Sequence, residues 1–521
     1  MDIRRHVATV AGRQVHYRRA GTGPVVVLLH QSPRSSLEML PLLRRLAQSY
    51  TVIAPDTPGN GLSTPLSIAA PTMGDFADAL AAFLTEIGVG KALVYGFHTG
   101  AMCAFELARR HPDRVACAVV NGYVHPSAEE RDDLLANYFV PFVPDWSGAH
   151  LVWAWARMRE QYIFYPWYRK SDAARIAIPE PSLDTVQADV LDLLCAGDHY
   201  RGPYRAAFTG DLDTAASEIE APTLIMTMKP DWPLRPHLAH MAPPSPSVTV
   251  AEPDTMAEAM ALLDAAFAAH RADADLSPAV APTRPLGDEG WARVLALAGG
   301  DLFVRTWGED TVRPPLLLLH DVGRSSADMG DVAPTWARDR KVIALDLPGC
   351  GDSADFGGAV TPVAQAAILR EAIAILAPDG FDLVGFGTAG PVAIELALAS
   401  PDGLSHVYAA RPEAPRTPMQ PPEAGGLHLF KAWLAERQKI LFEPGGSDGR
   451  DEAALDPARL HRIVLDALKG QASAAGIIAA AVGHAFETSV EALGTVRFSR
   501  LPDSPAAKHA LSALLCELEA A

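Results

Sequence analysis

Apolar residues follow two patterns along this chain. Short uninterrupted apolar runs recur, and the run 24–30, Pro-Val-Val-Val-Leu-Leu-His, is the clearest of them. Such β-branched runs are typical of strands that are buried on both faces of a sheet. Longer stretches such as 76–87 and 99–110 carry apolar residues at helical spacing. Strands that alternate with helices predict an α/β fold with a doubly wound, mostly parallel sheet.

The first half of the chain shows this alternation in full. We expect strands at 7–19, 24–30, 51–56, 92–95, 115–121, 222–227 and 247–251, and helices at 37–48, 76–87, 99–110 and 256–270. An aromatic-rich segment from about 123 to 213 interrupts the alternation between two of these strands. Part of it has helical spacing, so we interpret it as a helical cap over the sheet.

The second half repeats the first. Residues 271–287 are rich in Pro and Ala without periodicity, which predicts a linker. After it, His-x-x-x-Arg-Ser-Ser at 30–36 returns at 320–326, an offset of 290 residues. In the cap, Gly-x-His-Leu at 148–151 returns at 426–429, an offset of 278. Further spaced matches in the same order predict a tandem duplication.

We therefore expect domains at 1–270 and 288–521, with caps at about 123–213 and 411–485. We expect the second copy to be shortened near its end, because no clear counterpart of the strand 222–227 or of Asp231 is visible in its sequence. A fused repeat can imitate a dimer within one chain, so we expect the two modules to pack together. A homodimer formed by two whole chains is an alternative that the sequence leaves undecided.

The composition of the chain argues against several classes of binding partner. The formal net charge is −18, with acidic residues interspersed, which argues against nucleic acid and anionic membrane surfaces. The five cysteines are scattered without ligand or disulfide spacing, as in a reduced cytoplasmic protein. We see no signal peptide and no apolar run that could span a bilayer. No metal site and no phosphate-binding loop stands out, so we expect no cofactor.

The stretch Gly96-Phe97-His98-Thr99-Gly100 joins a predicted strand to a predicted helix. This layout, with glycines on both sides of a central residue, is that of a nucleophile elbow. The elbow normally presents Ser, Cys or Asp at its centre, whereas this chain has His98. The corresponding residue of the second copy is Gly387, which has no side chain for chemistry.

With these residues in view, the chain resembles two fused α/β-hydrolase-fold domains over nearly all of its length outside the linker. His30-Gln31-Ser32-Pro33 is similar to the His-Gly-x-Pro segment of that family, with Gln31 in place of the glycine. The resemblance implies an oxyanion hole formed by the backbone N–H groups of Ser32 and Thr99. It also implies a triad acid after the strand 222–227, where Asp231 stands. The place of the triad histidine, after the last strand, holds none.

The residues support several kinds of chemistry. A helix N-terminus disfavours an imidazolium, so we expect a neutral His98 that serves as general base or nucleophile. Its side chain is longer than that of serine and could reach Asp231, forming a base–orienter dyad. The reaction would be hydrolysis of an ester, lactone or activated C–C bond beside a carbonyl. A cofactor-free lyase or isomerase reaction with His98 as base is an alternative. A third is a non-catalytic protein in which His98 merely fills the turn.

The expected partner of the first module is a small, apolar or aromatic molecule, because the cap is rich in aromatic residues. The alternative is that these aromatics form the core of the cap itself. Candidate pocket residues are Gln31, Phe97, His150, Trp155, His199 and Trp232. The second copy, without an elbow side chain, shares the His150 motif, which favours a structural role for this histidine. His237 and His240 could replace the missing triad histidine. We interpret the second module as a degenerate, pseudo-enzyme copy.

Overall fold

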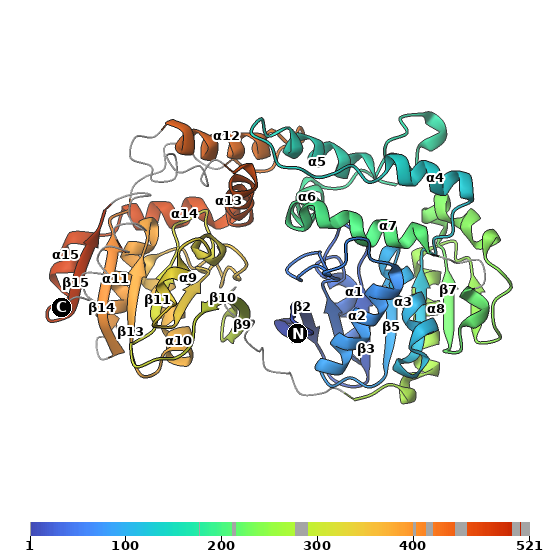
Figure 1. Cartoon of the computed structure of the whole chain (residues 1–521), viewed down its shortest axis with the longest axis horizontal. Helices are drawn as coiled ribbons and strands as arrows, with labels where there is room; N and C mark the ends of the chain where they lie inside the picture. Colours follow the sequence, from blue (N-terminus) through green and yellow to red (C-terminus); the bar gives the residue numbers. More distant parts are fainter. Residues whose placement is uncertain are drawn as a thin grey trace. The chain divides into compact units, whose positions relative to one another are not determined.

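The computed structural model describes residues 2–176, 178–210, 215–276, 290–399, 403–412, 420–442, 456–502 and 511. The chain forms two compact units. The first unit comprises Met1–Val143 and Trp153–Arg284, and the second comprises Pro144–Val152 and Pro285–Ala521. Each unit contains its own sheet with packed helices (Figure 1). Most of the predicted linker, 277–287, lies outside the described residues.

The sheet of the first unit has eight strands in the order β1-β2-β4-β3-β5-β6-β7-β8. β2 pairs antiparallel with β1 and β4, and all other neighbours are parallel. The strands are β1 Arg4–Val10, β2 Arg13–Ala20, β3 Val25–Leu29, β4 Thr51–Pro55, β5 Ala92–Phe97, β6 Val115–Asn121, β7 Thr223–Met226 and β8 Val248–Ala251. Every residue of β3 and β6 is buried, as expected for continuous apolar runs between two helical layers.

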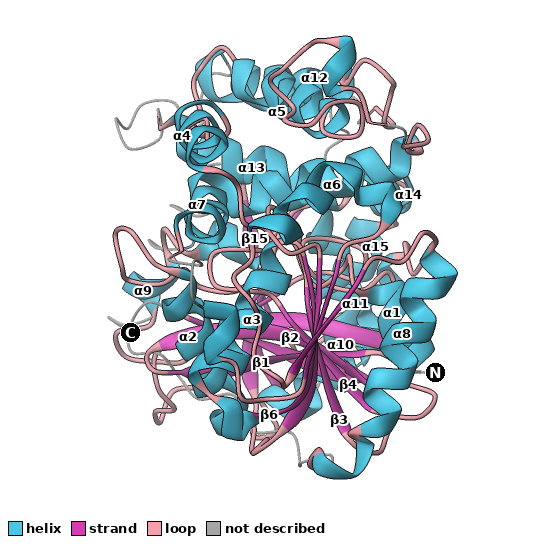
Figure 2. Cartoon of the chain, turned by 90° about the vertical axis from the view of Figure 1, so that its right-hand side faces the viewer, coloured by secondary structure: helices cyan, strands magenta, loops and turns pink. Residues whose placement is uncertain are grey.

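Helices cover both faces of this sheet. α1 (Leu40–Leu46) and α8 (Met256–Ala269) lie on one face, and α2 (Met73–Glu86) and α3 (Thr99–Arg110) on the other (Figure 2). α2 begins at Thr72, whose hydroxyl accepts from Asp75 N while the Asp75 carboxylate accepts from Thr72 N. This capping box satisfies N–H groups that the first turn leaves without partners.

The cap of the first unit is inserted between β6 and β7. Its helices are α4 Ala128–Asn137, α5 Ala149–Glu160, α6 Leu183–Ala196 and α7 Arg201–Thr209. The Arg157 guanidinium lies over the rings of Tyr138 (5.1 Å) and Trp167 (4.8 Å). Tyr138 also packs against Tyr204 at 5.4 Å between ring centroids. These aromatic residues are buried against one another and form the core of the cap.

The second unit has a seven-stranded sheet in the order β15-β14-β13-β11-β12-β10-β9. Its strands are β9 Trp291–Leu297, β10 Gly300–Trp307, β11 Leu316–Leu319, β12 Val342–Leu345, β13 Phe381–Gly385, β14 Leu404–Ala410 and β15 Arg497–Leu501. Its longer helices are α10 Pro362–Leu376, α11 Gly390–Ala399, α12 Leu427–Phe442, α13 Pro457–Lys469 and α14 Gln471–Val482. Antiparallel pairing is confined to β9–β10 and β10–β12.

One sequence-based expectation about this unit is wrong. A strand, β15, does follow the cap of the second unit, and it pairs in parallel with β14 as β7 pairs with β6 in the first unit. It was missed because Arg-Phe-Ser-Arg-Leu at 497–501 is a partly exposed edge strand with two charges rather than an apolar run. The fold class is confirmed, since the chain has two mixed, mostly parallel sheets with helices.

Among the described residues, no single helix is long and apolar enough to cross a membrane. α13 and α14 reach that length only together, and they are bent by 82° relative to each other.

Candidate active site

His98 sits at a sharp turn between β5 and α3. Its backbone has φ 48° and ψ −110°, a region that residues with a Cβ rarely adopt. The His98 N–H donates to Asn121 O on the neighbouring strand (2.9 Å), and its carbonyl accepts from Met102 N (3.1 Å). Such a conformation costs on the order of 1–3 kcal/mol, which the surrounding structure must offset. The turn therefore has the backbone geometry that the elbow pattern predicts.

The two flanking glycines allow this turn to be so tight. A Cβ on Gly96 would lie 2.1 Å from Gly100 O, and a Cβ on Gly100 would lie 2.3 Å from Leu29 O. The start of α3 is thereby pressed against the end of β3, next to the loop that contains Ser32. The half-exposed His98 ring packs against the Phe97 ring at 4.0 Å between centroids.

The loop after β3 is held by His30. Its Nδ1 hydrogen bonds Gln31 O (2.8 Å), and its Nε2 accepts from Thr57 N (2.9 Å). The Gln31 side chain turns away to donate to Glu38 (2.6 Å). The second unit repeats this arrangement at His320. The matched histidine of the repeat is thus a support for the loop and not a reacting group.

Three buried polar atoms at the carboxyl edge of the sheet have no hydrogen-bond partner among the described residues: Ser32 Oγ, Asn121 Oδ1 and Thr227 Oγ1. They follow or end β3, β6 and β7, and the strand order β3-β5-β6-β7 places the elbow among them. Buried polar groups are nearly always paired, so such atoms mark places where polar ligand atoms can bind. In open α/β sheets ligands bind at this edge.

A histidine–carboxylate pair lies near the same edge, between the cap and the 3-10 helix Lys229–His240 that follows β7. The buried His237 Nε2 is 3.2 Å from Glu130. Burial acts to raise the pKa of Glu130, but the hydrogen bond to His237 and the charges of His237 and His240 together outweigh that effect and lower the pKa. His240 Nδ1 donates to His125 O (2.8 Å). Sequence reasoning noted the two histidines but missed Glu130, which is more than a hundred residues away on α4.

The expected acid, Asp231, lies in that same 3-10 helix together with Trp232. The side chains of both residues are outside the described part of the structure. The His98–Asp231 dyad therefore stays a prediction.

The remaining candidates are spread over both units. His199 is exposed and contacts the turn at Gly59, since a Cβ there would lie 3.2 Å from His199 Cβ. Trp155 is buried in α5. His150 belongs to the second unit, where its ring packs against Trp433 (4.6 Å between centroids).

His150 Nδ1 accepts from Asp145 N (3.4 Å), and His428 Nδ1 accepts from Glu423 N (3.3 Å) at the same spacing. Burial lowers the pKa of His150 to about 4 and also lowers that of His428. Both imidazoles are thus neutral acceptors that hold the chain just before a cap helix. This geometry favours the structural role considered for the shared motif.

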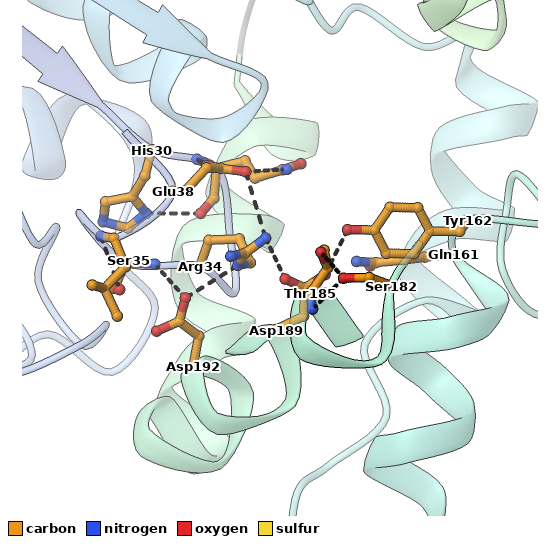
Figure 3. A network of polar contacts seen from close by, with 12 residues as sticks. His30, Arg34, Ser35, Glu38, Gln161, Tyr162, Ser182, Thr185, Asp189 and Asp192 are labelled. Atoms are coloured by element: carbon orange, nitrogen blue, oxygen red, sulfur yellow. Dashed lines mark hydrogen bonds and ion pairs between the residues drawn. The ribbon is translucent and has the colours of Figure 1, made fainter. Parts of the chain in front are cut away.

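An ion-pair network connects the loop after β3 to the cap (Figure 3). The Arg34 guanidinium contacts Asp189 (2.5 Å) and Asp192 (3.1 Å), both on α6. The Tyr162 hydroxyl donates to Asp189 (2.7 Å), and Ser35 N donates to Asp192 (3.2 Å). Burial raises the pKa of Asp189 to about 6 even though Arg34 acts in the opposite direction. The network positions the cap above the loop that carries Ser32.

Residues 24–147 match the family model described as alpha/beta hydrolase fold. The match covers β3 to β6 and the elbow, and it agrees with the family resemblance and the α/β-hydrolase fold that the sequence implied.

The chain is 38% identical over 109 residues to the dihydrolipoyllysine-residue acetyltransferase component of the acetoin cleaving system of Cupriavidus necator, covering 21% of this chain and 29% of that protein. It is 26% identical over 218 residues to (E)-2-((N-methylformamido)methylene)succinate hydrolase of Acinetobacter baylyi, covering 41% and 75%. Epoxide hydrolase A of Mycobacterium thermoresistibile superposes with a TM-score of 0.40 at 21% identity, covering 53% of this chain and 100% of that one.

Proposed function

We propose that the first unit hydrolyses a small carbonyl compound, an ester, lactone or activated C–C bond beside a carbonyl, with His98 as general base or nucleophile. The observation that carries this proposal is the imidazole held at a strained elbow, with φ 48°, beside unpartnered polar atoms at the carboxyl edge of the sheet. Strained residues cluster at functional sites. Hydrolases among the relatives, such as the succinate-derivative hydrolase of Acinetobacter baylyi, support the reaction class.

The chemistry would use the backbone and one imidazole. The Ser32 and Thr99 N–H groups would bind the carbonyl oxygen and stabilise the negative charge that develops on it. A neutral His98 would remove a proton from water as the water oxygen bonds to the carbonyl carbon. Collapse of the tetrahedral intermediate would break the bond to the leaving group, which takes the proton from the imidazolium. Direct attack by the imidazole, followed by hydrolysis of an acyl-imidazole, is the nucleophilic form of this route.

The substrate preference rests on polar atoms and not on the cap aromatics. The large rings that suggested an aromatic substrate are mutually packed in the cap core, so they give no separate support for an apolar ligand. The unpartnered atoms of Ser32, Asn121 and Thr227 favour a substrate with several polar atoms close to its reacting carbonyl.

His237 provides a second base candidate, because its pairing with Glu130 is observed directly. The carboxylate would orient the imidazole and stabilise its protonated form, as the acid of a triad does. In that case His98 would position the substrate and His237 would move the proton.

The test is turnover of aryl esters, alkyl esters and lactones by wild type, His98→Gln, His237→Gln and His270→Gln. Glutamine keeps hydrogen-bonding capacity but cannot accept the proton. We expect His98→Gln to lower kcat by roughly 10²- to 10⁴-fold, the usual contribution of a general base, with thermal stability retained. The partly exposed His270, which pairs with Asp273 (3.3 Å) after α8, is the matched control and should leave kcat unchanged. Wild-type kcat in His98→Gln would refute the role of His98, and loss only in His237→Gln would transfer it to that residue.

A further inference from the structure

The elbow of the second unit is filled by a carboxylate from its own chain. Asp321, which stands at the position of Gln31 in the repeat, accepts from the backbone N–H of Thr388 at 2.9 Å. The same Oδ1 accepts from Val322 N (2.8 Å) and from the Thr388 hydroxyl (2.7 Å). Val322 and Thr388 correspond to Ser32 and Thr99. The two donors that would form an oxyanion hole are therefore already bound to an anion.

This carboxylate also excludes a nucleophile. Gly387, at the elbow centre, has φ 52°, and a Cβ there would lie 2.4 Å from Asp321 Cγ. No larger side chain fits while the carboxylate stays in place. The second unit thus has neither the reacting side chain nor an open hole for a developing oxyanion.

A cavity nevertheless remains beside this closed elbow, within the second unit. Its volume is about 80 Å³, and it lies between the core loop at Val322 and Gly323 and the helices α12, α13 and α14. Ala435 on α12 leaves room for it. In the first unit the same repeat position, 278 residues earlier, holds Arg157, whose side chain is buried among aromatic rings. The two copies therefore differ in side-chain size at this position of the cap helix.

Among the residues that line the cavity, Lys431 and Lys439 are cations and Glu436 is a carboxylate. The Lys439 ammonium contacts Glu436 (2.7 Å), but the same carboxylate also pairs with Arg324 (2.9 Å). Burial acts to raise the pKa of Glu436, and the charges of Arg324 and Lys439 outweigh it and lower the pKa. The Glu436 carboxylate thus contacts both Lys439 and Arg324, and Arg324 also faces Asp328 and Asp321. Lys431 is the second cation at the wall and pairs with Glu423 (3.1 Å).

We propose that this cavity binds a small organic carboxylate that the second unit cannot hydrolyse. An ammonium has three donors, and Lys439 uses one of them on Glu436, so two can hold a ligand carboxylate. Lys431 attracts the same anion. The apolar side chains of Leu468 and Ile478 line the cavity and contact the body of the ligand. Ligand pockets commonly combine an apolar wall with a few placed polar groups in this way.

The test is binding of 4-fluorobenzoate and its neutral analogue 4-fluorobenzamide to the full chain, followed by fluorine NMR. We expect the acid to bind at least tenfold more tightly than the amide. Lys439→Gln should weaken the acid about tenfold, a typical loss for a charge-assisted hydrogen bond. Lys341→Gln is the matched control, because that lysine pairs with Asp310 outside the cavity, and it should leave binding unchanged.

A second pair of variants tests the place of binding. Ala435→Phe fills the cavity and should abolish binding, whereas Leu434→Phe, on the exposed side of the same helix, should not. His98→Gln should leave binding of the acid unaltered, which separates this site from any reaction in the first unit. Equal affinity for acid and amide, persistence of binding in Ala435→Phe, or no binding at millimolar probe would overturn the proposal.

Discussion

Asp466 is a buried carboxyl whose ionisation should destabilise the second unit at neutral pH. It lies on α13, where its Oδ2 accepts from the Ser325 hydroxyl (2.7 Å). Burial raises its pKa to about 7, with the Lys469 charge and Ser325 acting in the opposite direction. The perturbation of choice is Asp466→Asn. Asparagine has nearly the same shape, and its amide oxygen can still accept from Ser325, but it carries no charge.

The size of this destabilisation follows from the shift in the pKa of Asp466. The carboxyl has a pKa of about 7 in the folded chain, against an ordinary value of 3.8 for an aspartate. At 1.36 kcal/mol per pKa unit, ionisation in the folded state costs about 4 kcal/mol at most. Relaxation and water entry reduce such penalties, so we expect about 2 kcal/mol. The folded state binds the extra proton, hence stability is greatest below about pH 4, falls as pH rises to about 7, and is level above that.

The assay is urea unfolding of the second unit in wild type and Asp466→Asn near pH 4.5 and near pH 8. The variant should be about 2 kcal/mol more stable at the higher pH and nearly equal to wild type at the lower one. Asp331→Asn is the control, because it removes a half-exposed carboxylate paired with Arg459 and should change the free energy of unfolding by under 1 kcal/mol. If the difference between Asp466→Asn and wild type stayed constant with pH, the reasoning would be refuted.

Two further substitutions probe the network in the first unit and the closed elbow in the second. Arg34→Gln leaves the buried Asp189 without its cation, so we expect the free energy of unfolding to fall by roughly 3–5 kcal/mol. Part of this loss should be recovered in acid, where the Asp189 carboxyl is protonated. The control Arg45→Gln, which removes an exposed ion pair, should cost under 1 kcal/mol. Gly387→Ser should lower the midpoint of thermal unfolding, because its Cβ meets Asp321, and the added change Asp321→Gly should restore much of the loss. Simple additivity in that double variant would contradict the contact.

The sequence alone determined the fold class and the elbow. Continuous apolar runs specify strands buried on both faces, and β6 and α3 have the bounds that these patterns predict, 115–121 and 99–110. The glycines on both sides of His98 predicted a tight turn, because the backbone there packs too closely for larger side chains. These features were readable because they depend on residues close together in the chain.

Contacts between distant residues were decided only by the tertiary structure. The pairing of Arg34 with Asp189 and of His237 with Glu130 joins residues more than a hundred positions apart, and no local pattern marks such pairs. The edge strand β15 was invisible because its stability comes from pairing with β14 and not from an apolar run.

The closed elbow of the second unit shows the same division. Gly387 in the sequence indicated a missing nucleophile, but the carboxylate of Asp321 in the place of an oxyanion appears only when two loops, 66 residues apart, meet at one edge of the sheet. A backbone N–H has no signature in the sequence, so which anion it binds is fixed by three-dimensional packing. The sequence thus determined which groups are present, and the fold decided which of them meet.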